Sequence, residues 1–548
     1  MEAAQVHDEE LPLLERQQPT RPRKSWKPSC FVIVAVCLLF LQLSWLVSSF
    51  FRQDRNSVRY AGEHIAWNWC GDLKGRPLEC SSIDVPMDQF DSENSGNKTF
   101  NVPLVRLRGR NATQNLLLNP GGPGVGGFWM LQWRGEEIKA IVSEEFHLLA
   151  FNPRGVNSST PLATCYPDPK AMEQLSDARS SKDTDNPELY AWTQNFVQAC
   201  RDTTGEHGLY VNTPQTAADL NSILDAVGQK DMFYWGFSYG TLLGQTYATM
   251  FPDRAKRMII DGVANQFMWY ESHIDWEALA DTDRVLHGFY GECLKAGPGN
   301  CTLASLADSK EKLADLVDSK LEEIKMQPVA VYVNNTVYGV LTFEKLWLNG
   351  VFPALYFPES WYGLANNLAQ LLKGNATDAY LAYGQRKAWQ LEGDANRFVM
   401  MNDGLSGPEY WAQDRESLVE ELTPLMNQSS FSPSSLQIHY TKQQWLYPRT
   451  HLYKPRKGVK TAEPMLILST SFDPICPLVS AESANEAFEG SKMVEVQGYG
   501  HCSMAVEATC ARQHVQNFLF DGRLPEQKHT LCQVDSSYFV RSLEDGRT

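Results

Sequence analysis

The residue best suited to chemistry is Ser238, which lies at the centre of a Gly-x-Ser-x-Gly sequence between Gly236 and Gly240. Apolar residues from Met232 onward precede the turn and apolar residues at helical spacing follow it, so we expect a strand to lead through the turn into a helix. The two glycines permit a turn in which a Cβ would collide, and the turn presents the serine hydroxyl beside the N–H groups of a helix N-terminus. This pattern is typical of a nucleophilic serine.

A serine hydroxyl is a weak nucleophile and needs a base that is itself oriented by an acid, here in the chain order Ser, Asp, His. Asp473 follows an apolar strand candidate, and His501 follows the next one in a Gly-Tyr-Gly-His sequence. Loops at the carboxyl ends of parallel strands share one edge of a sheet, so both side chains can converge on Ser238. A lone histidine is usually structural, and Asp473 could instead cap a helix before Pro474, but the order and the turn glycines favour a catalytic triad.

Acyl transfer also requires hydrogen-bond donors for an oxyanion, and a glycine-rich loop at residues 119–127 can supply one of them. We expect the backbone N–H groups of Gly122 and Tyr239 to be these donors. The rival interpretation, a phosphate-binding loop, fails because no Gly-Lys-Ser/Thr ending follows. The sequence contains neither a zinc motif nor a dinucleotide-binding motif, so we expect no metal and no cofactor.

The elements that would position these residues alternate between strands and helices on both sides of a different middle region. Strands are expected at 115–119, 145–152, 232–237, 256–261, 464–469 and 492–496, with helices from 213, at 479–488 and at 505–520. Such alternation predicts an α/β fold with a parallel sheet covered on both faces. The Trp-rich, helix-prone region 266–455 is expected to be an inserted, mainly helical cap between core parts at 60–265 and 456–535.

Five motifs together carry a resemblance to a known family. They are Asn-Pro-Gly-Gly-Pro-Gly, Phe-Asn-Pro-Arg-Gly, Gly-Phe-Ser-Tyr-Gly, Phe-Asp-Pro and Gly-Tyr-Gly-His. Over residues 67–534 the chain resembles the tripeptidyl-aminopeptidase-like branch of the α/β-hydrolase serine peptidases, which are relatives of prolyl aminopeptidase. In that family the motif that contains Arg154 usually begins with Asp. This chain has Asn152, so no ion pair is expected at that position.

The resemblance implies an α/β-hydrolase fold and an enzyme that removes residues or short peptides from free N-termini. Acidic groups of the cap would bind the ammonium group of the substrate. Glu271, Asp275 and Glu277 open the cap, although carboxylates on a solvated helix are the common alternative. Two other functions stay open, namely an esterase or lipase with the same machinery and a binding ectodomain without catalysis.

Length and charge limit the class of protein further. With 548 residues the chain exceeds what one hydrophobic core usually holds, so a domain with a large insertion or two domains are expected. A hydrophobic fraction of 43% with 21% charged residues is typical of a globular protein. The net charge of −16 and the lack of a basic patch argue against nucleic acid as a partner.

An apolar segment at residues 31–51, after a tail at 1–30, is long enough to cross a membrane. Four basic residues between 21 and 27 precede it, and only Arg52 and Arg55 follow closely, so the tail is expected in the cytosol. The chain would then be a single-pass type II membrane protein with a lumenal or extracellular catalytic domain. A cleaved signal peptide is the alternative interpretation.

The tail also carries a short pattern that resembles dileucine sorting signals, formed by Glu9 with Leu13 and Leu14. Such signals are read by sorting adaptors and route membrane proteins to endosomes, vacuoles or lysosomes. We therefore expect the catalytic domain in one of these lumens, with the cell surface or a secreted form as alternatives.

Ten cysteines and seven glycosylation sequons lie beyond the apolar segment, as expected in an oxidising compartment. The cysteines are Cys70, Cys80, Cys165, Cys200, Cys293, Cys301, Cys476, Cys502, Cys510 and Cys532, and the sequons begin at Asn97, Asn111, Asn157, Asn300, Asn334, Asn375 and Asn427. Pairing of neighbours would join 70 with 80, 165 with 200, 293 with 301 and 510 with 532, although sequence leaves connectivity open. A bridge between Cys476 and Cys502 would tie the loops of the expected acid and base together.

Overall fold

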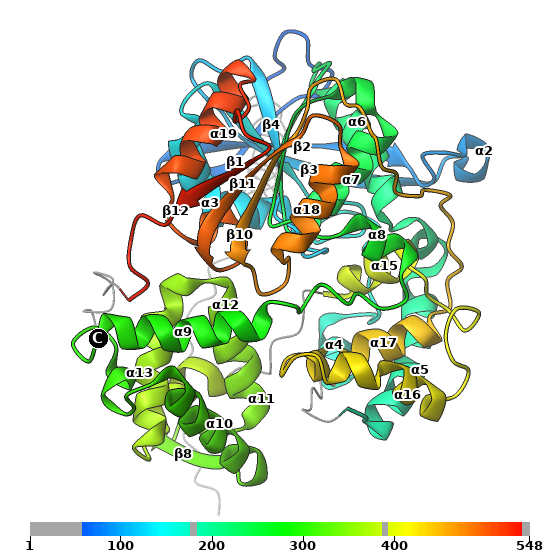
Figure 1. Ribbon diagram of the computed structural model, residues 1–548. Helices are drawn as coiled ribbons and strands as arrows, with labels where there is room; N and C mark the ends of the chain where they lie inside the picture. Colours follow the sequence, from blue (N-terminus) through cyan, green and yellow to red (C-terminus); the bar gives the residue numbers. More distant parts are fainter. Residues whose placement is uncertain (1–56, 176–183, 386–392, 540–548) are drawn as a thin grey trace, which may run out of the picture. The chain divides into compact units, whose positions relative to one another are not determined.

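A ten-stranded sheet forms the centre of the protein (Figure 1). Its strands lie in the order β1-β2-β3-β5-β4-β6-β7-β10-β11-β12. Their bounds are β1 Asn68–Leu73, β2 Arg76–Pro86, β3 Thr99–Leu107, β4 Gln114–Asn119, β5 Phe146–Phe151, β6 Met232–Phe237, β7 Ala255–Asp261, β10 Leu466–Phe472, β11 Lys492–Tyr499 and β12 His529–Gln533. The pairs from β1 to β5 are antiparallel, and all pairs from β5 to β12 are parallel.

This computed structural model describes residues 57–175, 184–385 and 393–539. The expected membrane segment at 31–51 and the sorting residues Glu9, Leu13 and Leu14 lie outside these ranges. Across the described ranges, we find no helix with both the length and the apolar character needed to cross a membrane.

All six strands expected from apolar runs are confirmed, with small changes at their ends. The sequence analysis missed β1–β3 and β12. β1 and β2 alternate buried and exposed residues irregularly because they lie at the edge of the sheet, so they lack the continuous apolar run of a central parallel strand. The sheet is therefore mostly parallel with an antiparallel edge.

Helices cover both faces of the sheet (Figure 1). One face packs against α3 (Gly127–Val142) and α19 (Thr509–Asp521), and the other against α6 (Thr213–Ala226), α7 (Tyr239–Met250) and α18 (Leu478–Ala487). The two apolar layers are separate clusters of buried residues. A fully buried leucine contributes about 1.5–3 kcal/mol to stability, so these layers fix the strand ends on which the site is built.

The segment from 266 to 455 is mainly helical in its described residues and includes one hairpin. It contains α8 Gln266–Glu271, α9 Thr282–Ala296, α10 Lys310–Met326, β8 Val329–Asn334, β9 Val337–Leu341, α11 Phe343–Leu346, α12 Phe352–Tyr356, α13 Trp361–Leu372, α14 Thr377–Ala379, α15 Gly393–Asp403, α16 Arg415–Met426 and α17 Leu436–Gln444. Its helices bury two further apolar clusters. The second cluster also takes Leu189 from α5 (Pro187–Thr204), which precedes Ser238 in sequence. Helices from both sides of the nucleophile turn thus build this layer.

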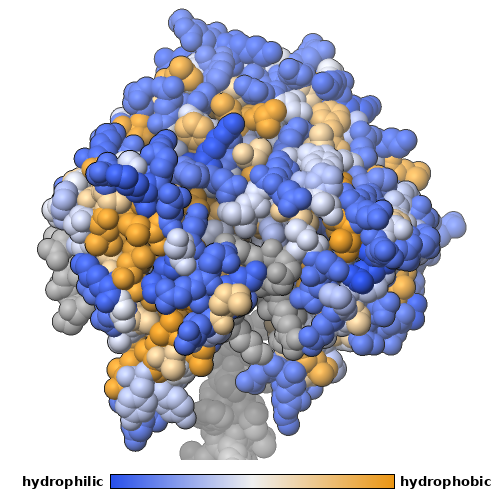
Figure 2. Space-filling model, turned by 60° about the horizontal axis from the view of Figure 1, so that its bottom comes forward, coloured by the Kyte–Doolittle hydropathy of each residue, from blue (hydrophilic) through white to orange (hydrophobic). Residues whose placement is uncertain are grey.

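The four disulfides expected from neighbouring cysteines are confirmed. They join Cys70 to Cys80, Cys165 to Cys200, Cys293 to Cys301 and Cys510 to Cys532. The asparagine of each of the seven sequons is exposed, so a glycan could be accommodated at every one. Figure 2 shows a face that is largely hydrophilic with apolar side chains in scattered groups, in keeping with the net charge of −16.

Candidate active site

The turn between β6 and α7 places Ser238 in a backbone conformation that a residue with a side chain rarely adopts, with φ 56° and ψ −127°. A Cβ on Gly236 would lie 2.4 Å from the carbonyl oxygen of Gly240, and one on Gly240 would lie 2.7 Å from that of Asn119. Neither turn position tolerates a side chain, which is the reason the sequence pattern requires glycine there. Such strain costs on the order of 1–3 kcal/mol and persists where the surroundings impose it.

Asp473 and His501 come together at the ends of β10 and β11. The imidazole Nδ1 of His501 lies 2.9 Å from each carboxylate oxygen of Asp473, which is fully buried. An ionised carboxylate only accepts hydrogen bonds, so Nδ1 carries the ring proton and Nε2 is left with a free electron pair. The arrangement therefore fixes the tautomer in which histidine can act as a base.

Backbone N–H groups from both loops hold the Asp473 carboxylate. Ile475 and Cys476 donate to Oδ1 at 3.0 and 2.8 Å, and Cys502 donates to Oδ2 at 2.9 Å. The thiol of Cys476 in turn contacts the hydroxyl of Ser238. Through these contacts, the loops that follow β6, β10 and β11 bring the three residues predicted from sequence to one edge of the sheet.

The expected bridge between Cys476 and Cys502 is wrong, because both residues are free, buried cysteines. Both thiols lie close to Ser238: that of Cys476 contacts the Ser238 hydroxyl, and that of Cys502 contacts the Ser238 backbone. The Cys502 sulfur also packs against Gly262, where an added Cβ would lie 2.5 Å from it. Burial raises the pKa of both thiols well above the ordinary value, and the nearby Asp473 adds to the effect. Backbone N–H groups, rather than a disulfide, join the two loops to the acid.

The glycine-rich loop after β4 lies against the serine turn. A Cβ on Gly121 would be 2.5 Å from the carbonyl oxygen of Phe237 and 3.1 Å from the backbone nitrogen of Tyr239. Gly121 and Gly122 both have positive φ, at 102° and 104°, so only glycine adopts this path without strain. The structure thus brings together the two segments that contain the expected oxyanion donors.

Comparison with known proteins agrees with this arrangement. A family model described as alpha/beta hydrolase fold matches residues 114–290, and one described as TAP-like protein matches residues 437–532. The chain is therefore a hydrolase with the α/β-hydrolase fold. Its resemblance to the tripeptidyl-aminopeptidase-like branch of that fold is confirmed by the second match.

Three curated relatives are similar to this α/β-hydrolase over most of its length. It is 24% identical over 489 residues to tripeptidyl aminopeptidase from Streptomyces lividans, which covers 85% of this chain and 86% of the relative. It is 25% identical over 491 residues to serine protease Hip1 from Mycobacterium tuberculosis, with 85% and 90% covered. It is 24% identical over 483 residues to carboxylesterase B from the same species, with 84% and 88% covered.

A further buried carboxylate of this hydrolase, Asp261, was missed by the sequence analysis. It ends β7, and its backbone oxygen accepts a 3.0 Å hydrogen bond from the Ser238 N–H. Its side chain accepts bonds from the N–H and hydroxyl of Ser503, at 2.6 and 2.7 Å, and from Trp235 at 3.3 Å. Burial raises its pKa to about 6, and the nearby His501 partly opposes the shift. The sequence feature that could have indicated this residue is an expected strand at 256–261 that ends in Asp, soon after the nucleophile turn.

The hydrolase places three acidic residues of the segment after β7 close to the catalytic loops. Burial raises the pKa of Asp281, and the neighbouring charge of Asp473 raises it further. Burial also raises the pKa of Asp275, whose carboxylate accepts two backbone bonds. Glu277 accepts a 2.9 Å bond from Ser480. Glu271, by contrast, is exposed.

Another arginine contact replaces the ion pair that Asn152 makes impossible. Arg154 is fully buried and donates to both carboxylate oxygens of Asp219 on α6, at 2.7 and 2.6 Å. It also donates to the carbonyl oxygen of Met87 at 2.7 Å. The loop after β5 is thereby fixed to α6, the helix that precedes β6 in the chain.

A cavity of about 770 Å³ lies beside the catalytic edge without reaching Ser238. It is bounded by Phe472 and Tyr499 at the ends of β10 and β11 and by Asp281 and Arg284 at the start of α9. Because Phe472 directly precedes Asp473, the cavity lies next to the loop that carries the candidate acid.

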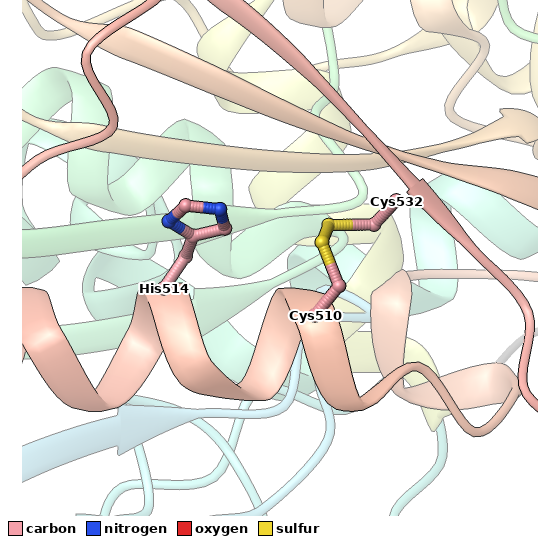
Figure 3. A group of neighbouring side chains, drawn as sticks. All are labelled: Cys510, His514 and Cys532. Atoms are coloured by element: carbon pink, nitrogen blue, oxygen red, sulfur yellow. A yellow bond between two sulfur atoms is a disulfide. The ribbon is translucent and has the colours of Figure 1, made fainter.

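Two groups of side chains in the described ranges have the spacing of metal ligands. In one, Cys510 and Cys532 lie beside His514 (Figure 3). Because their sulfurs form a disulfide, they offer no thiolate to a metal. The other consists of Asp473, Cys476 and His501, which already serve the site described above.

Proposed function

We propose that this α/β-hydrolase is a serine exopeptidase that releases residues or short peptides from free N-termini. The observation that carries the proposal is the pair of 2.9 Å contacts between His501 Nδ1 and Asp473, in a cluster that includes the strained Ser238. In this proposal Ser238 is the nucleophile, His501 the base and then the acid, and Asp473 the residue that orients the imidazole.

The reaction begins when Nε2 of His501 takes the Ser238 proton as the hydroxyl attacks the scissile carbonyl. The carbonyl oxygen becomes an oxyanion, which the N–H groups of Gly122 and Tyr239 stabilise. The imidazolium then gives its proton to the leaving amine, and an acyl-enzyme remains on Ser238. Water, activated by the same imidazole, hydrolyses the acyl-enzyme and restores the serine.

Two features support a free N-terminus as the recognised group. The relatives named tripeptidyl aminopeptidase and serine protease Hip1 cover 85% of this chain. Asp275, Glu277 and Asp281 bring acidic groups toward the catalytic loops, where a carboxylate would attract a substrate ammonium.

The experiment compares kcat/KM for a tripeptide anilide with a free N-terminus against the same substrate with an acetylated N-terminus. We expect the free amine to be preferred by about 100-fold, since one charge-assisted contact in a dry site is worth roughly 1.5–3 kcal/mol. Equal rates for the two substrates would contradict an exopeptidase.

Ester hydrolysis is the second candidate, favoured by the relative named carboxylesterase B. Amides and esters are cleaved by the same machinery, so the insertion decides between them. A p-nitrophenyl ester without an amino group would then be the better substrate by kcat/KM. The third candidate is a binding ectodomain without catalysis. Failure of a fluorophosphonate to label Ser238 would favour it.

For its location we propose a type II membrane protein with a lumenal catalytic domain in a vacuole, lysosome or endosome. Four disulfides and seven exposed sequon asparagines support an oxidising, glycosylating compartment. A mobility shift on glycosidase treatment tests the lumenal side. Retention at the cell surface after substitution of Leu13 and Leu14 by alanine tests the sorting signal and its adaptor.

A further inference from the structure

Helix α15 of the insertion is bonded directly to the segment of one proposed oxyanion donor and, through Thr213, to the side chain of the other. Asn396 lies in its first turn and Asp403 ends it, so the two residues are seven positions, or about two helical turns, apart. At this spacing they lie on one face of the helix. Both are buried, with exposed fractions of 1% and 0%.

Asn396 reaches the glycine-rich loop. Its Nδ2 donates a 2.9 Å hydrogen bond to the carbonyl oxygen of Pro123, the residue after Gly122. The Pro123 carbonyl lies one residue after Gly122 in the chain. The bond to Asn396 therefore holds the loop immediately after the first donor. The loop's own bond, from the Gly121 N–H to Asn119, acts only on the opposite side of Gly122.

Asp403 reaches the second donor through Thr213. The Thr213 hydroxyl donates to one carboxylate oxygen of Asp403 at 2.5 Å and the Thr213 N–H to the other at 2.8 Å. The Thr213 hydroxyl proton is thus used, so the Tyr239 hydroxyl, 2.6 Å away, must donate to Thr213. Trp269 donates to the same carboxylate at 2.8 Å. Tyr239 is thereby held at its ring end, while its backbone nitrogen lies beside the glycine loop.

We propose that Asn396 and Asp403 are positioning residues that set the separation of the two oxyanion donors. The inference rests on the proposed function, because it assumes that Gly122 and Tyr239 donate to the oxyanion. Neither residue touches the reacting atoms, and each acts through one neighbour. An oxyanion donor is worth about 10²–10³ in kcat, and a shift of about 1 Å costs on the order of 10²-fold.

Asn402 of the same helix is the matched control. It is also an asparagine with 1% exposure, and its Nδ2 donates to the carbonyl oxygens of Gly208 and Val211, at 2.7 and 3.0 Å. Neither carbonyl belongs to the glycine loop or to the serine turn. Asn402→Ala therefore removes buried hydrogen bonds and volume of the same kind but leaves the partners of the Asn396–Pro123 and Asp403–Thr213 bonds in the protein.

The test measures kcat, KM, thermal stability and the Ki of a peptide boronate, whose tetrahedral oxygen occupies the oxyanion hole. For Asn396→Ala and Asp403→Asn we expect kcat to fall by about 10- to 100-fold, KM to change less than about 3-fold, and the boronate Ki to rise as kcat falls. Asn402→Ala should lower thermal stability while changing kcat less than either variant. A uniform loss in all three variants, or an unchanged kcat in the two positioning variants, would overturn the inference.

A second pair of variants covers the case in which Asp403→Asn does not fold. Thr213→Val removes the hydroxyl that links Tyr239 to Asp403, and Thr213→Ser keeps it. We expect the valine variant to lose kcat and boronate affinity together and the serine variant to recover most of both, whereas equal behaviour of the two would count against the link. Labelling of wild-type Ser238 by a fluorophosphonate distinguishes the two proposals. If Ser238 is not labelled, the proposed function is wrong. If Ser238 is labelled but kcat is unchanged in the positioning variants, only the role proposed for α15 is wrong.

Discussion

The catalytic edge of the sheet and helix α15 of the insertion are built in different ways. Asp473 and His501 are 28 positions apart in the chain, and the two strands that precede them pair in parallel. The contacts of α15 instead cross 273 positions from Asn396 to Pro123 and 190 from Asp403 to Thr213. The positions of the side chains at the sheet edge are set by the strand order and by backbone turns. The contacts of α15, by contrast, are single side-chain bonds to residues distant in the chain. Reactive groups can therefore be read from local motifs, but the groups that align their partners cannot.

The largest expected effect tests the catalytic edge. Ser238→Ala should lower kcat by about 10⁶-fold, because the remaining base has no nucleophile to activate. His501→Ala should lower it by a similar factor, and the double variant by no more, since the residues act as one unit. Single-turnover kinetics with a tripeptide anilide measure this. Ser305→Ala, at an exposed serine, is the control; additive losses in the double variant would contradict a shared mechanism.

The next effect concerns a long-range side-chain contact that supports the core. Arg154→Met leaves Asp219 buried without its partner and should cost about 3–5 kcal/mol in the free energy of unfolding. Arg110→Met, at a side chain with 85% exposure, should change it by less than about 0.5 kcal/mol. Urea unfolding measures both. A loss below about 1 kcal/mol at Arg154 would show that the pair does not hold the loop after β5.

Backbone geometry at the edge predicts a smaller loss. Gly236→Ala places a Cβ 2.4 Å from a carbonyl oxygen and should destabilise by roughly 1–3 kcal/mol while displacing the serine turn. Gly291→Ala is its control, because this glycine of α9 has open space around it and a helical backbone. That variant should be stabilised by about 0.5–1 kcal/mol. Unchanged stability and kcat in Gly236→Ala would break the argument that the turn demands glycine.

An effect of similar size, confined to a narrow pH range, is expected at Asp261. Its pKa is raised to about 6 by burial, so between about pH 4 and pH 6 the folded protein holds a proton that the unfolded chain has released. Wild-type stability should therefore fall relative to Asp261→Asn as pH rises through this window, by up to about 3 kcal/mol. Urea unfolding from pH 4 to pH 7 measures the difference. If the free energy of unfolding has the same pH dependence in both proteins, the prediction is wrong. Asp202→Asn, at an exposed carboxylate, is the control.

Sequence alone determined the six central strands and the nucleophile turn, because long apolar runs and turn glycines are local properties. It also predicted the meeting of Asp473 with His501 and the four disulfides between neighbouring cysteines. The expectation of a Cys476–Cys502 bridge was wrong, because two cysteines on neighbouring loops need not have the geometry that a disulfide requires.

Only the tertiary structure decided the remaining features. The pairing of β3 with β5, the pairing of Arg154 with Asp219, the buried carboxylate of Asp261 and the contacts of α15 depend on residues tens to hundreds of positions apart. A motif records which backbone shape and which functional group a short segment needs. It does not record which distant side chain will lie within about 3 Å once the apolar layers have packed, because that distance is set by the sum of all those contacts.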